Sequence, residues 1–141
     1  MSDPYNLYRF VGAQDRVFDR VVGELKSGLK RSHWMWFIFP QIRGLGSSSV
    51  AQTYAISSLE EAKAYLQHPI LGERLRECVR LVNGLDGRTR HEIFGSPDDM
   101  KFHSSMTLFA LADPQEPLFA AALQKFCDGV TDSATIDRLK G

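Results

Sequence analysis

A group of residues suited to binding an anion follows the most aromatic stretch of the chain, in SHWMWFIFPQIRGLGSSS at residues 32–49. Arg43 is followed by Gly44 and Gly46, which can adopt backbone conformations that other residues avoid. Three serines come next and could cap a following helix: Ser47, Ser48 and Ser49. Free amides at a helix start, hydroxyls and a guanidinium bind phosphate or carboxylate groups readily. The loop therefore predicts an anion site.

The same loop also fits an ordinary connector. The pattern GLGSSS lacks the third glycine of a dinucleotide-binding fingerprint and the GK[ST] ending of a phosphate-binding P-loop. Glycine and serine are also the usual residues of turns that end in a helix cap. Both interpretations of residues 44–49 stay open from the sequence.

The aromatic run before the loop offers a surface for a ring-shaped ligand. If the run is helical, His33 shares a face with Trp36; if it is extended, Trp34 and Trp36 share a side and His33 lies opposite. In the first case Trp36 could stack a base or a sugar while His33 supplies a proton or a hydrogen bond. The alternative is that these rings are core, because large apolar side chains stabilise a fold mainly by burial.

A second polar cluster lies in KFHSSMTLF, residues 101–109. On a helix, Lys101 and Ser105 are four residues apart and Ser104 adjoins them, which gives a polar stripe on an otherwise apolar helix. Small hydroxyls on a helix also serve close packing and local backbone bonds, so this stripe has a structural interpretation as well. Ser48, Ser104 and Ser105 have no GxSxG or SxxK context that would activate them, and no serine hydrolase is predicted.

Neither a metal nor a cofactor is expected. The four histidines lack HExxH or similar spacing, and Cys78 and Cys127 have no CxxC or other metal-ligand spacing. The acidic pairs Glu60-Glu61 and Asp98-Asp99 fall at expected helix starts, where the helix dipole favours negative charge. These residues therefore need no catalytic explanation.

Composition limits the possible partners. Seventeen basic residues balance 17 acidic ones, so no overall field attracts nucleic acid or an anionic membrane. No apolar run is longer than the six residues at 34–39, which is far too short to span a membrane, and the N-terminus has no apolar signal segment. With 141 residues, the chain fits one globular domain over 1–141. We therefore expect a cytoplasmic protein with no nucleic-acid or membrane partner and an oligomeric state that the sequence leaves open.

Helical spacing dominates the rest of the chain, and an all-α fold of about seven short helices is expected. Start and stop signals delimit helices within residues 13–28, 57–68, 69–84, 89–95, 96–113, 116–129 and 131–139. Ser32 could cap a brief helical piece that Pro40 ends. Six apolar residues in a row also suit a buried strand, so one short extended segment at 34–39 is the alternative.

Three strings, found in order, resemble an uncharacterised bacterial family. They are SHWMWFIFPQIRGLGSSSVAQTYAI, EAKAYLQHPILGERLREC and IFGSPDDMKFHSSMTLF. They are similar to the domain-of-unknown-function 1810 family, also called Rv1873-like, over a match from about Phe10 to the C-terminus. The resemblance implies a compact all-helical fold and brings no established activity.

Two functions follow from these observations. The first is a pocket for a phosphorylated or nucleotide-like anion, ADP-ribosyl compounds included, with hydrolytic chemistry if His33 acts as acid or base. Its predicted binding residues are Trp36, Gln41, Arg43, Gly44, Gly46, Ser47, Ser48, Ser49, Tyr54, Lys101, Ser104 and Ser105. The second is a non-enzymatic protein–protein interaction module, because Trp, Tyr and Arg dominate binding hot spots. The exposure of Trp34 and Trp36 would distinguish them.

Overall fold

The computed structural model describes residues 3–140, and all of its regular elements are helices. The ten helices are α1 (Tyr8–Asp15), α2 (Phe18–Ser27), α3 (Met35–Ile38), α4 (Ser49–Thr53), α5 (Leu59–Gln67), α6 (Leu71–Asn83), α7 (Arg90–Phe94), α8 (Asp98–Ala112), α9 (Pro117–Phe126) and α10 (Ser133–Lys140). The expected all-α class is confirmed, with more helices than predicted because several are very short. None of the helices within residues 3–140 is both long enough and apolar enough to cross a membrane.

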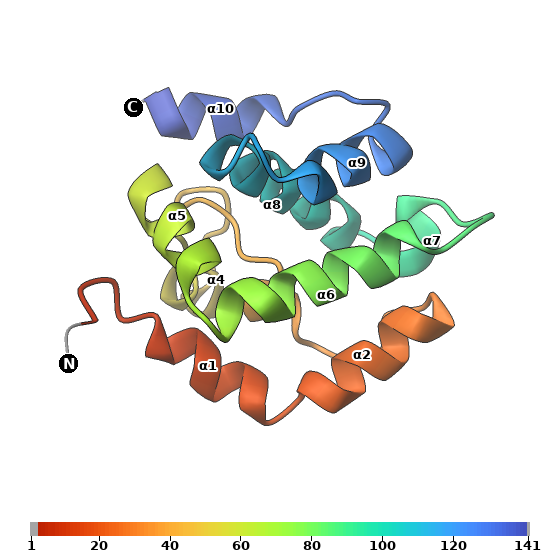
Figure 1. The fold of residues 1–141 in the computed structure, drawn as a ribbon, viewed down its shortest axis with the longest axis horizontal. Coiled ribbons are helices and arrows are strands. Elements are labelled where there is room, and N and C mark those ends of the chain that lie inside the picture. The colour runs from red at the N-terminus through yellow and green to blue at the C-terminus, as the bar shows by residue number, and fades with distance from the viewer. Residues whose placement is uncertain (1–2, 141) are drawn as a thin grey trace.

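Helix α6 runs through the middle of the fold (Figure 1). Helix α2 packs on one side of α6 and α9 on another, while α5 leads into its start. Helix α8 packs against α5, α9, α7 and α10, so it links the elements at the top of Figure 1 to those at the left. The apolar face of α6 is buried: Leu71, Leu75, Cys78, Val79 and Val82.

Local signals delimit most helices as predicted. Gly28 ends α2 with φ +76°, in the left-handed region. Ser58 caps α5 by accepting a hydrogen bond from the amide of Glu61, and Thr89 and Glu92 form a capping box at α7. Asp132 caps α10, because its Oδ2 accepts from the amide of Thr135.

The helix expected over residues 13–28 is instead part of two helices. Val17 has φ −130° and ψ −3°, which interrupts the helix between α1 and α2. Each half packs against a different element, α1 on α3 and α2 on α6. Gln14 at the end of α1 is buried and donates to the carbonyl of Phe37 and to the hydroxyl of Tyr65. The break lets both halves follow the curved surface of the core.

The extended alternative for residues 34–39 is wrong. The segment contains the one-turn helix α3, in which the amides of Ile38 and Phe39 bond to the carbonyls of Trp34 and Met35. Ser32 does not cap this helix, because its hydroxyl donates to Glu24. The apolar content of residues 34–39 could not distinguish a helix from a strand, because buried helices and buried strands can have the same composition.

Aromatic rings fill the centre of the fold. Phe39 and Phe102 meet edge to face at 5.2 Å between centroids, and Phe94 stacks on Phe102 at 4.7 Å. Tyr65 meets Phe10 and Phe109 at 5.1 and 5.3 Å. These buried rings come from four different helices and the residue after α3, so they hold together elements far apart in the chain.

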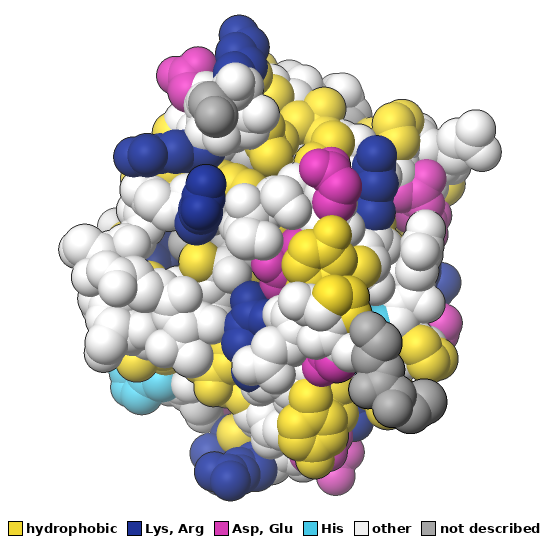
Figure 2. Space-filling model, turned by 90° about the vertical axis from the view of Figure 1, so that its left-hand side faces the viewer, with side chains coloured by type: hydrophobic (Ala, Val, Ile, Leu, Met, Phe, Trp, Pro, Cys, Tyr) yellow, Lys and Arg dark blue, Asp and Glu magenta, His cyan; other side chains and the backbone are white. Residues whose placement is uncertain are grey.

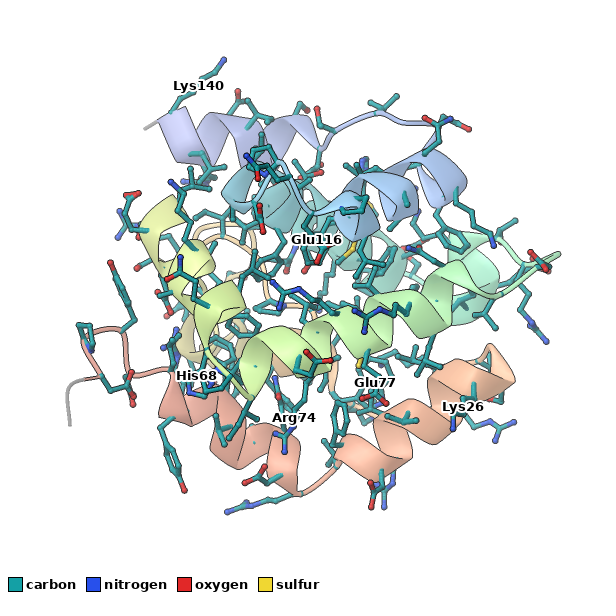
Figure 3. The ribbon with its side chains drawn as sticks, in the orientation of Figure 1. Lys26, His68, Arg74, Glu77, Glu116 and Lys140 are labelled. Carbon is teal, nitrogen blue, oxygen red and sulfur yellow. The ribbon has the colours of Figure 1, made fainter. Side chains whose placement is uncertain are left out.

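The corner between α5 and α6 depends on a glycine. A Cβ atom on Gly72 would overlap with the carbonyl oxygen of Leu66. His68 lies at the same corner (Figure 3), where its Nδ1 accepts from the amides of Ile70 and Leu71 at 3.1 and 3.2 Å. These two amides belong to the start of α6, so His68 supplies the cap that the residue before the helix lacks.

Candidate functional site

The loop after α3 begins from a fixed backbone contact. Ile42 and Ile56 form an isolated parallel bridge, in which Arg43 donates its amide to the carbonyl of Ile56 and Ile56 donates to that of Gln41. Ile42 and Ile56 are both buried. The bridge anchors the loop, residues 41–46, to the segment that precedes α5.

The two glycines of the loop are needed for different reasons. Gly44 has φ +92°, and a Cβ there would come within 2.8 Å of the guanidinium carbon of Arg138. Gly46 does not have a positive φ; instead, a Cβ there would come within 2.7 Å of the Cβ of Ala51. Gly44 thus allows the chain to turn, and it also leaves room for Arg138 of α10 to pack over it. Gly46 lets the loop approach α4.

A small pocket opens between this loop and α4, with a volume of about 100 Å³. We call it the Arg43 pocket. Its lining residues are Trp36, Gln41, Ile42, Arg43, Gly44, Gly46, Ala51, Gln52, Tyr54 and Ala55. The structure therefore brings together six of the predicted site residues: Trp36, Gln41, Arg43, Gly44, Gly46 and Tyr54.

The pocket lining contains hydrogen-bond donors that the protein does not use. The amides of Gly44 and Gly46 donate to no acceptor within residues 3–140. Arg43 is exposed and forms no ion pair with the described part of the chain. The amide of Arg43 itself is consumed by Ile56, so it is not available to a ligand.

The two aromatic walls of the pocket are held by packing. Tyr54 lies 5.3 Å from the ring of Phe37 and 5.8 Å from that of Phe10. Trp36 is half-buried, and the Lys101 ammonium lies 5.1 Å from its ring centroid. Lys101 also lies 3.6 Å from Asp98, so its charge is partly balanced. Trp36 therefore presents ring surface to the pocket beside a paired cation.

Trp34, in contrast, is core. It is fully buried, and its indole nitrogen donates to Glu24 at 2.9 Å. The same carboxylate accepts from the amides of Arg31 and Ser32 and from the Ser32 hydroxyl. Burial would raise the pKa of Glu24, but these hydrogen bonds outweigh it and lower the pKa to about 2. Glu24 thereby fixes the segment that leads into α3.

Of the predicted residues that precede α5, four lie outside the pocket. His33 is exposed and lines neither this pocket nor the neighbouring depression described below. Ser48 caps α4, with its Oγ accepting from the amide of Ala51 at 3.1 Å. Ser47 and Ser49 are exposed beside it and bond Gln52 and Thr53 through their carbonyls. The serines therefore build the helix behind the pocket rather than the pocket itself.

A second depression, of about 250 Å³, adjoins the first. We call it the Met100 depression; it is lined by Gln41, Leu45, Gly46, Pro97, Met100, Lys101, Ser104, Asp132 and Ala134. Ser104 donates to Met100 and to Asp132 Oδ2 at 2.9 Å, so its hydroxyl is tied to α10. Ser105 is fully buried, lines neither hollow, and has no partner for its hydroxyl within residues 3–140.

Several lining residues were missed from the sequence. Gln52 lies next to the predicted serines and could have been included on proximity alone. Met100, Asp132 and Arg138 could not, because nothing local indicates that the start of α8 and all of α10 border the loop. Among residues 3–140, no three His, Cys, Asp or Glu side chains lie close enough together to hold a metal ion.

Comparison with known proteins agrees with this fold. The model of the family described as "Protein of unknown function (DUF1810)" matches residues 4–139. The crystal structure of the conserved hypothetical protein Rv1873 from Mycobacterium tuberculosis is 57% identical in sequence, with 99% of each chain covered and a TM-score of 0.97. No curated protein matches the chain. Because the family model spans nearly all of its length, the chain belongs to the DUF1810 family, whose function is unknown.

Proposed function

We propose that this protein binds a small phosphorylated anion in the Arg43 pocket. The observation that carries the proposal is that Gly44 and Gly46 line the pocket and their amides donate to no acceptor within residues 3–140, beside an arginine that has no ion-pair partner there. Backbone amides and a guanidinium are the donors that a phosphate accepts from most readily. The half-buried ring of Trp36 adds a flat surface for a nucleotide-like group beside the phosphate.

The proposal is for binding rather than hydrolysis. The residues that line the Arg43 pocket include no His, Asp, Glu or Cys. His33, the predicted acid or base, is exposed and outside the lining. The interaction-module alternative has less support, because Trp34 is fully enclosed and only Trp36 reaches a hollow surface.

A thermal-shift titration tests the proposal. Inorganic phosphate and AMP should each raise the melting temperature, because a ligand at 100 times its Kd adds about 2.7 kcal/mol of stability. Arg43→Gln should remove most of this shift. Arg20→Gln is the matched control, since Arg20 is exposed on α2 and likewise lacks an ion pair with the described residues. No shift with either anion, or an equal shift in Arg43→Gln, contradicts the proposal.

A further inference from the structure

The Arg43 pocket is the middle of a longer groove. It shares Gln41 and Gly46 with the Met100 depression, and Arg43 and Gly44 with a third hollow that Arg138 lines. Helix α10 and its cap border both outer hollows, with Asp132 and Ala134 at one end and Arg138 at the other. The three hollows therefore follow one another along the loop, residues 41–46, with α10 beside them.

One end of the groove is basic. Arg43 and Arg138 together line two adjoining hollows of about 370 and 360 Å³. Neither guanidinium lies within ion-pairing distance of a carboxylate in residues 3–140, although Asp137 and Glu60 border these hollows. Figure 2 views this side of the molecule, where Lys and Arg side chains gather toward the top, the level at which α10 lies. Two unpaired guanidiniums at one spot are suited to a second phosphate.

The packing of Arg138 is specific. Its guanidinium lies over the Cα of Gly44, as close as the missing side chain allows. Gly44 is also in the left-handed backbone region, at φ +92°. The turn that supplies an unused amide to the Arg43 pocket therefore also supports the second cation. A phosphate in the pocket and a phosphate at Arg138 would be neighbours.

The opposite end of the groove is mostly apolar, and its one cation, Lys101, lies 3.6 Å from the carboxylate of Asp98. The side chain of Met100 is 64% exposed, and Leu45, Pro97 and Ala134 complete its surroundings. An exposed thioether is a good partner for an aromatic ring because it is flexible and polarizable. Asp132 lines the same depression, and Ser104 and Thr135 bond only to its Oδ2, which leaves Oδ1 to accept from the edge of such a ring.

We propose that the groove binds a nucleoside diphosphate, which rests on the proposed function of the Arg43 pocket. The base lies in the Met100 depression, the first phosphate in the Arg43 pocket, and the second phosphate between Arg43 and Arg138. The difference between the two ends fixes this direction, since the phosphates meet two guanidiniums without ion-pair partners in residues 3–140 at one end, whereas the cation at the other end, Lys101, is already paired with Asp98.

The basic end is tested by calorimetric titration of ADP, GDP, CDP and UDP, each beside its monophosphate. At least one diphosphate should bind about tenfold more tightly than its monophosphate, the gain typical of a charge-assisted contact. Arg138→Gln should remove this difference and leave the monophosphate affinity unchanged. Lys140→Gln is the control, because Lys140 is an exposed cation of α10 at the edge of the fold (Figure 3).

The apolar end is tested by comparing that diphosphate with inorganic pyrophosphate. Met100→Ala should weaken the nucleotide severalfold and leave pyrophosphate unchanged, since only the nucleotide reaches the depression. Arg138 and Met100 are both exposed, so circular dichroism should show unchanged helix content in Arg138→Gln and Met100→Ala.

The outcomes separate this inference from the function on which it rests. Equal affinity for monophosphate and diphosphate, with binding still lost in Arg43→Gln, overturns the diphosphate assignment and keeps the anion pocket. A diphosphate preference that survives Arg138→Gln overturns the second phosphate position. Equal weakening of pyrophosphate and nucleotide by Met100→Ala overturns the base position. No binding of any of these ligands overturns both proposals.

Discussion

Glu24 is the residue on which the segment before α3 depends. Its carboxylate accepts four hydrogen bonds, two from backbone amides and two from the side chains of Ser32 and Trp34. Lys30 lies 5.0 Å from the Trp34 ring centroid and pairs with Asp98 at 2.8 Å, so the segment is also tied to the start of α8. The carboxylate therefore holds residues 31–34 in the turn that leads into the core.

We expect Glu24→Gln to destabilise the fold at neutral pH by about 1–3 kcal/mol, because an amide replaces a charged acceptor in a buried site. The folded-state pKa is about 2, below the ordinary value of 4.5. The stabilisation is therefore fully present above pH 4.5 and is lost as the pH falls toward 2. Urea unfolding of both proteins between pH 7 and pH 3 measures this. A stability difference that stays constant over this range contradicts the assignment.

Among individual residues, those of the candidate site that lie close together in the sequence could be predicted. Trp36, Gln41, Arg43 and Tyr54 lie in one stretch of the chain, so reading their chemistry was enough to group them. Arg138 carried no such signal, because its position over Gly44 results from the packing of α10. His33 was chosen for its chemistry, and its exposure depended on where α3 begins.

Among the elements, the corner between α5 and α6 shows how one side chain serves two helices. The amide of His68 ends α5 by donating to the carbonyls of Ala64 and Tyr65, while its ring caps the first amides of α6. On the other side of α6, Arg74 reaches Asp15 at 2.7 Å and the ring of Phe18 at 5.0 Å (Figure 3). The position of α6 is thus set from both directions.

His68→Ala should lower the free energy of unfolding by about 1 kcal/mol, the usual loss for a helix cap. His68→Asn should recover part of this loss, because its side-chain oxygen can accept from the same amides. Chemical denaturation of the three proteins compares them. Equal stability of wild type and His68→Ala would mean that water replaces the cap without loss.

Helix ends were predictable where a cap or a glycine marks them, as for α2, α5, α7 and α10. The short helices were not. Helix α3 and helix α4 span four and five residues, too few for an apolar period to distinguish a helix from a strand or a turn. The break at Val17 was also missed, because the apolar spacing continues across it.

At the scale of the whole molecule, the aromatic core joins distant parts of the chain. Phe102 of α8 contacts Phe39 after α3, Phe94 of α7 and Phe126 of α9. Composition indicated a core of this kind, and helical spacing indicated its class. Which rings meet could not be predicted, because composition and local spacing do not reveal how the ten helices of residues 3–140 pack.

Phe102→Ala should destabilise the protein by about 3–5 kcal/mol, because it opens a cavity where four elements meet. Phe126→Ala should have a smaller effect, since that ring is only half-buried. Thermal unfolding followed by circular dichroism ranks the two. The opposite order would mean that the core is organised around another residue.

The glycine at the α5–α6 corner has a consequence for the groove. Gly72 lets the backbone of α6 touch the last turn of α5, so even one added methyl group would push the two helices apart. The segment leading into α5 contains Ile56, whose carbonyl fixes the amide of Arg43. The distance between the guanidiniums of Arg43 and Arg138 therefore depends on the missing side chain of Gly72, at the far end of α5. A substitution at residue 72 should weaken ligand binding although this residue does not line the groove.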